Sequence, residues 1–238
     1  STLFDGKEAE ESIVELSDCL ECRDRSVASL RDHQELFHFE AELIHKWSDA
    51  ERTFIQSAIL DRPDLQFVTF HAASCCSDPI LDGYQYGVGG TIYSREQMLD
   101  NALENIKWLR SFIPSSIEIG IENNNYYPTP AYDHVTDGDF LSEIVTTNNI
   151  RFLFDIAHAY VTAHNKNISY KTYVESLPLH VISQVHVCKS GIGDGDIAVD
   201  LHLPPDEKEL SEVQALVQKH PSLRYVTIEY YQDVSILL

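Results

Sequence analysis

RFLFDIAHAYVTAHN, residues 151–165, begins as a buried strand and then places ionisable side chains where apolar ones would cost less to bury. Asp155 closes the apolar run, and His158 follows three residues later, in what the pattern indicates is the loop after the strand. A buried charge is stable only when a partner neutralises it. The stretch therefore predicts a functional site at the carboxyl end of this strand.

Five further segments share the β-branched and aromatic content of residues 151–156, and together the six predict strands. They are residues 35–43, 67–71, 117–123, 182–187 and 225–230, with SIVEL at 12–16 as a candidate seventh strand. Helical patterns lie between them, at residues 94–112, 137–148 and 204–220. The first opens with a capping box of Ser94 and Gln97, and the third has Pro205 at a position that suits a first turn.

Alternation of strands and helices about 30 or more residues apart predicts a parallel α/β sheet. The glycine motifs GxGxxG and GxxxxGK[ST] do not follow any of these strands, which removes the usual nucleotide-binding reasons for an open, doubly wound sheet. We therefore predict a TIM-type (β/α)8 barrel in one domain, residues 1–238. Whether an eighth strand is missing from the amino terminus stays open.

Composition restricts the partners and the compartment. With 17 Lys and Arg against 38 Asp and Glu, the formal charge of −21 repels nucleic acid and anionic membranes. No apolar run approaches the roughly 18 residues of a membrane span, and we expect a cytoplasmic protein. Five cysteines do not form a disulfide framework. Cys19 and Cys22 are a weak zinc signal, and we expect them in an irregular or helical segment.

Ionisable residues recur at the carboxyl ends of the predicted strands. His71, Glu122, Asp155, His186 and Glu229 each end a strand or lie late in it. A parallel barrel gathers the carboxyl ends of its strands into one ring, the face on which such barrels carry chemistry. These five side chains are therefore predicted to converge.

Two short motifs add to this ring. Asp155-x-x-His158 joins a carboxylate to an imidazole, and VDLH places Asp200 and His202 on one side of an extended segment. Converging carboxylates stay ionised only if cations neutralise them, and oxygen and nitrogen donors suit iron, manganese or zinc. So many donors exceed the needs of one ion and predict two or three. The candidate ligands are His38, His71, Glu122, Asp155, His158, His186, Asp200, His202 and Glu229, with Glu40 competing for the place of His38.

The other polar residues are predicted to orient the ligands or to have structural roles. Asn123, Asn124 and Cys188 are expected to orient the ligands, although Cys188 also suits simple packing. The remaining histidines on strands, helices and loops are more often hydrogen-bonded core or rim residues than ligands; these are His45, His134, His164, His180 and His220.

The ring of Glu122 with DIAH, QVHV, DLH and IEY resembles the superfamily of xylose-isomerase-like barrels, which includes sugar isomerases, epimerases and the endonuclease that cuts at abasic sites. Within it, residues 151–187, VDLHLP and YVTIEY look most like the multinuclear non-haem iron-dependent oxidases that modify ribosomally made peptides, such as the methanobactin-biosynthesis oxidase. The resemblance covers residues 36–231 and is specific mainly from residue 117 onward.

That resemblance implies two or three iron ions, with manganese or zinc as the alternative, and the ligands named above. It implies that Glu122, Asp155, His186 and Glu229 are catalytic, and that dioxygen is used on a cysteine, asparagine or similar residue of a peptide delivered by a small partner protein. Many members have Asn where this chain has His158, which leaves the ligand count open. Residues 74–93 resemble an insertion near the site and suit a substrate-binding loop.

Three other functions compete with the oxidase as interpretations of this sequence. A sugar isomerase or epimerase needs one divalent ion, for which Glu122, Asp155, His186 and Glu229 suffice, so it leaves the remaining candidate ligands unexplained. An abasic-site endonuclease would share most of the ligands, but a chain of charge −21 lacks the basic surface that DNA requires. A metal-storage protein does not need ligands that converge at one end of a barrel.

Overall fold

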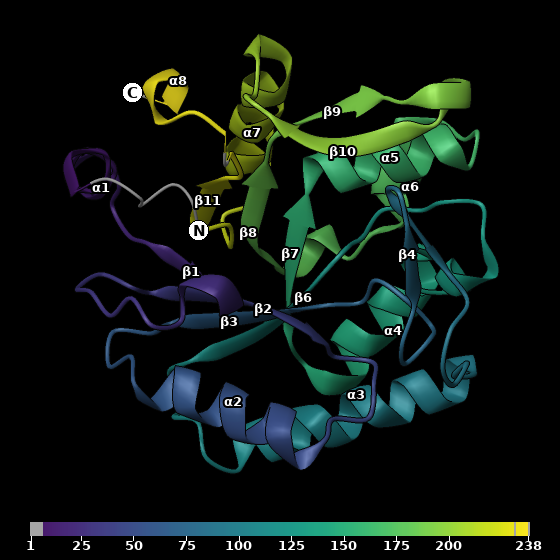
Figure 1. Ribbon diagram of the computed structural model, residues 1–238, viewed down its shortest axis with the longest axis horizontal. Helices are drawn as coiled ribbons and strands as arrows, with labels where there is room; N and C mark the ends of the chain where they lie inside the picture. The colour runs from purple at the N-terminus through teal and green to yellow at the C-terminus, as the bar shows by residue number, and fades with distance from the viewer. Residues whose placement is uncertain (1–6, 231, 238) are drawn as a thin grey trace.

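A nearly closed barrel of parallel strands forms the centre of the computed structural model, which describes residues 7–230 and 232–237 (Figure 1). Residues 1–6, 231 and 238, which the predicted domain includes, lie outside the described part. The strand order follows the chain: β1 (Glu21–Arg23), β2 (Leu36–Glu42), β3 (Phe67–His71), β6 (Glu118–Glu122), β7 (Arg151–Asp155), β8 (Ile182–Val187) and β11 (Tyr225–Ile228). The predicted barrel is confirmed, with seven strands in the described part.

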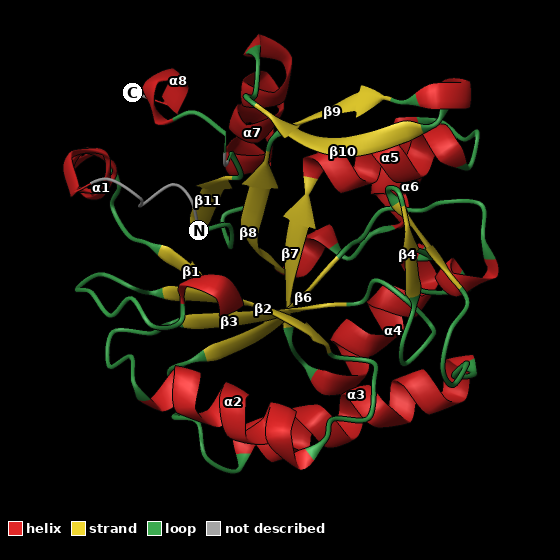
Figure 2. Ribbon diagram, viewed as in Figure 1, coloured by secondary structure: helices red, strands yellow, loops and turns green. Residues whose placement is uncertain are grey.

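Most of the helices lie around the outside of these strands, whereas α1 (Lys7–Leu16) and α8 (Val234–Leu237) lie apart from them, near the two ends of the chain (Figure 2). The bounds of the other helices are α2 (Asp49–Leu60), α3 (Arg95–Arg110), α4 (Gly138–Asn148), α5 (Ile156–Asn165), α6 (Tyr170–Ser176) and α7 (Glu207–Lys219). The Ser94 capping box of α3 is present as predicted, with Gln97 as its partner. In the described residues no helix is both long and apolar enough to cross a membrane.

Three local predictions were wrong. Residues 12–16 lie in α1, and the seventh strand is instead the short β1. Cys22 lies in that strand, buried, because β1 pairs with β2 with Cys22 opposite Phe37. The third helix begins at Glu207, since Asp206 is its N-cap and accepts the N–H of Lys208; Pro205 therefore precedes the helix.

Two antiparallel hairpins follow carboxyl ends of barrel strands. The first, β4 (Ile80–Asp82) with β5 (Gln85–Gly87), lies in the predicted insertion after β3. The second, β9 (Lys189–Ile192) with β10 (Ala198–Leu203), follows β8 and contacts α5, above which it lies in Figure 1. Both insertions are therefore placed at the end of the barrel that the sequence assigned to chemistry.

The two faces of the strands differ in chemistry. Large apolar side chains such as Phe39 and Phe70 are fully buried between the strands and the helices, as the predicted strand phase requires. Inside the barrel the residues are smaller or polar, for example Thr69 and Gln184. Gly120 leaves room there for an aromatic ring, because a Cβ at this position would lie 2.6 Å from Cζ of Phe67.

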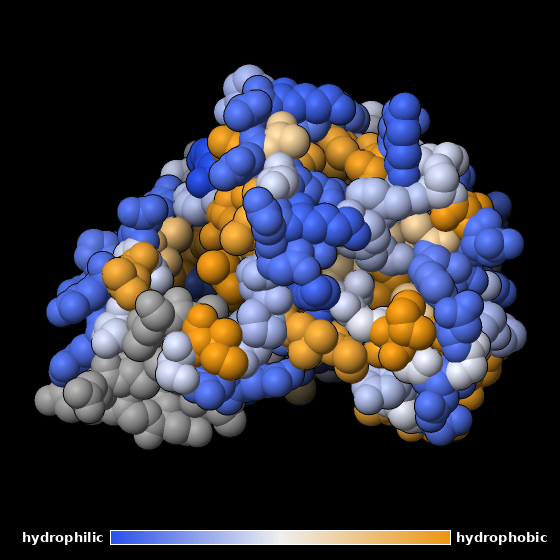
Figure 3. Space-filling view, turned by 90° about the horizontal axis from the view of Figure 1, so that it is seen from above, coloured by the Kyte–Doolittle hydropathy of each residue, from blue (hydrophilic) through white to orange (hydrophobic). Residues whose placement is uncertain are grey.

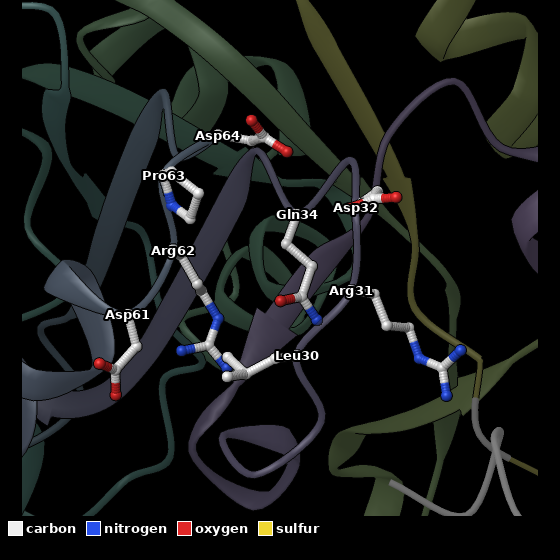
Figure 4. Close-up of a pocket in the computed structure, with 8 residues that line it drawn as sticks. All are labelled: Leu30, Arg31, Asp32, Gln34, Asp61, Arg62, Pro63 and Asp64. Carbon is white, nitrogen blue, oxygen red and sulfur yellow. The ribbon is translucent and has the colours of Figure 1, made fainter.

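A cavity of about 230 Å³ opens at the opposite end of the barrel, before β2 and β3 (Figure 4). Arg62 lies in its wall, where it donates to the carbonyl oxygens of Ala58 and Val27 and stacks over Phe37. These contacts hold the chain together at the amino-terminal ends of the strands. In barrels of this type that end serves stability, and the cavity is not the site.

Gly120→Ala should lower the free energy of unfolding by about 1–3 kcal/mol, because the new methyl group would overlap the Phe67 ring in a filled interior. Urea unfolding followed by circular dichroism measures this loss. Gly87→Ala is the control: its Cβ would meet only the Ile80 carbonyl oxygen at 3.7 Å, and we expect a change within about 0.5 kcal/mol. Equal stability of both variants would contradict the described packing inside the barrel.

Candidate metal centre

Glu122 lies at the centre of a cluster at the carboxyl ends of the strands. Its Oε2 is 3.3 Å from His38 Nε2 and 3.8 Å from His71 Nδ1. Its Oε1 is 3.1 Å from His186 Nδ1 and 3.9 Å from His158 Nδ1. One fully buried carboxylate thus contacts four imidazoles that four different segments supply.

The remaining candidates continue the cluster toward solvent. Asp200 Oδ2 lies 3.3 Å from His158 Nε2 and 3.4 Å from His202 Nδ1. His202 Nε2 is 3.5 Å from Glu229 Oε2, and His158 Nε2 is 3.9 Å from Asp155 Oδ2. All nine residues selected from the sequence therefore meet in one place, as the strand positions predicted; their role as ligands remains a prediction.

Exposure rises along the cluster. His38, Asp155 and His186 are completely buried, whereas the side chains of His71 and His202 are 20% and 32% exposed. The cluster is thus closed at its inner end and open at its outer end. Among the nine candidate ligands, these two histidines are the most exposed to solvent.

The junction between β7 and α5 explains the three-residue spacing of Asp155 and His158. Asp155 is the N-cap of α5: its Oδ1 accepts the N–H of His158 at 2.7 Å, so His158 lies in the first helical turn and not in a loop as predicted. Asn123 holds this junction, since its side chain pairs with the N–H and the carbonyl of Asp155. The Asn123 carbonyl oxygen accepts from His158 Nδ1 at 2.8 Å, which leaves Nε2 facing Asp200.

An irregularity in β10 orients its two candidate ligands, Asp200 and His202. The pairing with β9 shifts between Val199 and Leu203, and His202 has a φ of 46°, in the left-handed region that non-glycine residues seldom adopt. Asp200 Oδ1 accepts the backbone N–H of His202 at 3.2 Å and stabilises this turn. Such backbone strain is typical of functional sites, where it aims a side chain that a regular strand would point elsewhere.

Hydrogen bonds on the ring nitrogens that point away from Glu122 fix the imidazoles of His38 and His186. Nδ1 of His38 bonds to the Thr69 hydroxyl at 2.8 Å, and Nε2 of His186 bonds to a Glu21 carboxylate oxygen at 2.9 Å. Asn124 Nδ2 lies 3.3 Å from His71 Nδ1. In His38 and His186 the other nitrogen faces the cluster, which is how metal-binding histidines are usually held.

The cluster contains buried polar atoms without hydrogen-bond partners. Such atoms indicate whether the site could hold a metal ion. Six of its buried atoms have no hydrogen-bond partner: His38 Nε2, His71 Nε2, both Glu122 carboxylate oxygens, Asp155 Oδ2 and His186 Nδ1. Buried polar groups are almost always paired, and so many without a partner in one place need an explanation. Each is a donor atom that a divalent cation accepts. The donor set therefore fits metal ions.

The pKa shifts in the metal-free protein also fit a metal-binding role for the cluster. Burial, with the carboxylates of Glu229 and Glu122 adding to it, raises the pKa of Asp155 to about 7. Burial and the neighbouring His38 lower the pKa of His71 to about 3, so this imidazole is neutral and can bind a metal. Burial alone would lower the pKa of His186, but the adjacent carboxylates, Glu21 and Glu229 above all, outweigh it and raise the pKa well above its usual value. Metal binding would replace such protons.

Two residues that contact the cluster were missed by sequence reasoning. Glu21 and Arg23 extend from β1 into the cluster, where they contact His186 and Glu229. The strand has three residues, of sequence ECR, and lacks the β-branched content that identified the others. Only the spacing of the two charges, at i and i+2, marks them as sharing a face of an extended segment.

Cys188, His45 and His164 have polar partners in the structure. Cys188 Sγ lies 3.5 Å from Asp200 Oδ1, next to the ligands. His45 is buried and bonds to the Ser74 carbonyl oxygen at 2.7 Å, and His164 bonds to the Asp196 carbonyl oxygen at 2.8 Å. These two histidines have the structural roles expected of them.

Comparison with known proteins gives a family and a fold. Residues 56–235 match the model of the family described as RiPP precursor modification enzyme MbnB/TglH/ChrH. A UPF0276 protein of Vibrio vulnificus (strain YJ016) is 27% identical over 118 residues, 48% of this chain and 40% of the relative. One from Caulobacter vibrioides (strain NA1000 / CB15N) is 31% identical over 88 residues, 36% of this chain and 31% of that protein. The match thus spans less than half the length of these relatives.

Among solved structures, D-psicose 3-epimerase of Clostridium cellulolyticum H10, described with D-tagatose, superposes with a TM-score of 0.54 and 14% identity. The match covers 96% of this chain and 80% of the epimerase. At this identity the likeness shows the barrel fold alone.

Asp200→Asn should lower the number of divalent ions bound per chain by one, and Glu122→Gln by more, because Glu122 contacts donors on both sides of the cluster. Equilibrium dialysis of the metal-free protein against Mn²⁺, followed by elemental analysis, gives the counts. Asp194→Asn, at an exposed carboxylate outside the cluster, should bind as the unmodified protein does. Full occupancy in both ligand variants would show that the assignment is wrong.

Proposed function

The chain belongs to the family of RiPP precursor modification enzymes, those that modify ribosomally made peptides, and from this premise we propose that it is a multinuclear non-haem iron-dependent oxidase. It would bind two or three iron ions and use dioxygen to alter a residue of a substrate peptide. The observation that carries the proposal is the Glu122 carboxylate, fully buried, without hydrogen-bond partners and surrounded by four imidazoles.

The number of donors supports a multinuclear centre. One ion of about six-fold coordination cannot use nine side chains, and the cluster extends from the closed end at His38 to the open end at His202. Glu122 has two oxygens that face different histidines, which suits a carboxylate shared between two ions. A mononuclear isomerase would leave the outer donors without a role.

The candidate ligands would have different roles according to their depth in the cluster. Iron bound here would supply the redox chemistry with dioxygen, which amino-acid side chains do not provide. His38, Glu122 and His186 would hold metal in the water-free inner part, while His38 and His186 keep their ring orientation through Thr69 and Glu21. The exposed edges of His71 and His202 would face the substrate residue.

The substrate peptide would approach over the β4–β5 hairpin in the inserted segment 74–93. Ile80, Leu81 and Tyr84 are each more than 60% exposed there, an unusual number of large apolar side chains on one short hairpin. The inserted segment follows β3, whose last residue is the candidate ligand His71, and the hairpin begins at Ile80. A small recognition protein would deliver the peptide. The face seen in Figure 3 is mixed, with hydrophobic patches among hydrophilic side chains.

Protein purified with iron should bind at least two iron equivalents and consume dioxygen when its precursor peptide is added. Elemental analysis and an oxygen electrode measure both, and mass spectrometry of the peptide should show a changed residue. A ketohexose under the same conditions, with Mn²⁺ in place of iron, tests the epimerase alternative. A single bound ion together with sugar turnover would replace the oxidase proposal.

Leu81→Asp should raise the KM for the peptide by about tenfold or more while leaving the metal content unchanged, because it places a charge on the proposed docking hairpin. Leu210→Asp serves as the matched control, since Leu210 is also exposed but lies on α7. If both variants keep the original KM, the hairpin does not bind the peptide.

A further inference from the structure

Glu21, His186 and Glu229 form one corner of the cluster, with donor atoms as close together as in a metal site. This corner differs from the rest because a side-chain cation already lies in it. The Arg23 guanidinium is 3.2 Å from Glu21 Oε1 and also contacts Glu229 Oε1. The Arg23 side chain is 14% exposed, and those of its two partners 6% and 3%.

The guanidinium is a fixed charge at this corner. Arginine stays protonated at any pH at which proteins fold, and its planar group bridges carboxylates well. It contacts a carboxylate oxygen of Glu21 and one of Glu229, and all three side chains are largely buried. Arg23 therefore neutralises negative charge at this corner without a metal.

Glu21 has a second contact that a metal would disturb. Its Oε2 accepts from His186 Nε2 at 2.9 Å and is also contacted by the Gln184 amide. With Nε2 engaged in this way, His186 Nδ1 is turned to Glu122 at 3.1 Å, Glu229 at 3.6 Å and Asp155 at 4.0 Å. Glu21 is therefore a positioning residue for His186, and its carboxylate is already shared between an imidazole and a guanidinium.

We propose that Arg23 is a built-in cation of the centre: it occupies the Glu21–His186–Glu229 corner, so that the protein binds two metal ions and not three. His38, Glu122 and His186 would hold one ion, and Glu122, Asp155 and His158 would hold the other. This inference rests on the multinuclear centre of the proposed function, and narrows its two or three ions to two.

The charges of the cluster agree with this number. Five carboxylates meet there, and one guanidinium leaves four negative charges, which two divalent ions neutralise when the histidines are neutral. The five are Glu21, Glu122, Asp155, Asp200 and Glu229. Without Arg23, a fifth negative charge would remain, and a third ion could bind at the vacated corner.

Arg23→Gln tests the proposal, with Arg23→Lys as the matched control that keeps the charge. Metal-free protein is titrated anaerobically with Co²⁺, and the ions bound per folded chain are counted by equilibrium dialysis and by the visible absorption of bound Co²⁺. We expect two ions in the unmodified protein and in Arg23→Lys, and three in Arg23→Gln. Three ions in the unmodified protein, or an unchanged count in Arg23→Gln, would overturn the proposal.

Glu21→Gln provides an independent measurement. It keeps Arg23 but removes the anionic partner of His186, so the count should remain two while the affinity for Co²⁺ falls about 10- to 100-fold. An unchanged affinity would refute the positioning role of Glu21. These counts need neither dioxygen nor peptide. A protein that binds two Co²⁺ ions and gains a third in Arg23→Gln, yet consumes no dioxygen, would refute the oxidase and support the role of Arg23.

Discussion

The need to neutralise buried carboxylates at one end of the barrel governs the rest of the structure. Unit charges about 4 Å apart interact by about 4 kcal/mol at the effective dielectric near a protein surface, so converging carboxylates need cations close by. Glu122, Asp155 and Glu229 are almost completely buried and lie near one another. Imidazoles and one guanidinium surround them, but atoms on both Glu122 and Asp155 keep no hydrogen-bond partner. The metal-free protein therefore carries an electrostatic cost that bound cations would relieve.

The fold meets this constraint by holding several of the candidate ligands through further hydrogen bonds. Asn123 alone holds the backbone of Asp155 and the ring of His158, while Thr69 and Glu21 hold the rings of His38 and His186. Such contacts keep the donors aimed inward even though their charges repel, which is the main structural requirement of a preorganised metal centre. The strain at His202 belongs to the same requirement, since it turns an imidazole from an added hairpin toward a centre that the barrel strands define.

Sequence reasoning succeeded where one physical signal was sufficient. Buried parallel strands have a continuous apolar content that locates them, and the end of a strand is where the rule for parallel barrels places chemistry; His71, Glu122 and His186 were found in this way. It failed where tertiary contacts determine the structure. β1 has no pattern of its own and forms because it pairs with β2, so Glu21 and Arg23 could not be placed beside His186. His158 was assigned to a loop because the capping of α5 by Asp155 was overlooked. The exposed hairpin in residues 74–93 has no periodic signal that separates it from a loop.

The same barrel can serve one ion or several, and the difference here comes from what is added at its open end. Glu122, Asp155, His186 and Glu229 come from the barrel strands or from the residue directly after them, and four such ligands suffice for the single ion of an isomerase or epimerase. Asp200 and His202 come from the β9–β10 hairpin, which follows β8 and contacts α5. This hairpin places a carboxylate beside His158, where a second ion has donors. Arg23 contacts Glu229, and under our proposal this permanent cation would keep a metal out of the corner that Glu229 shares with Glu21 and His186. The number of ions would then depend on short segments outside the regular strand pattern, and fold likeness alone does not determine the reaction.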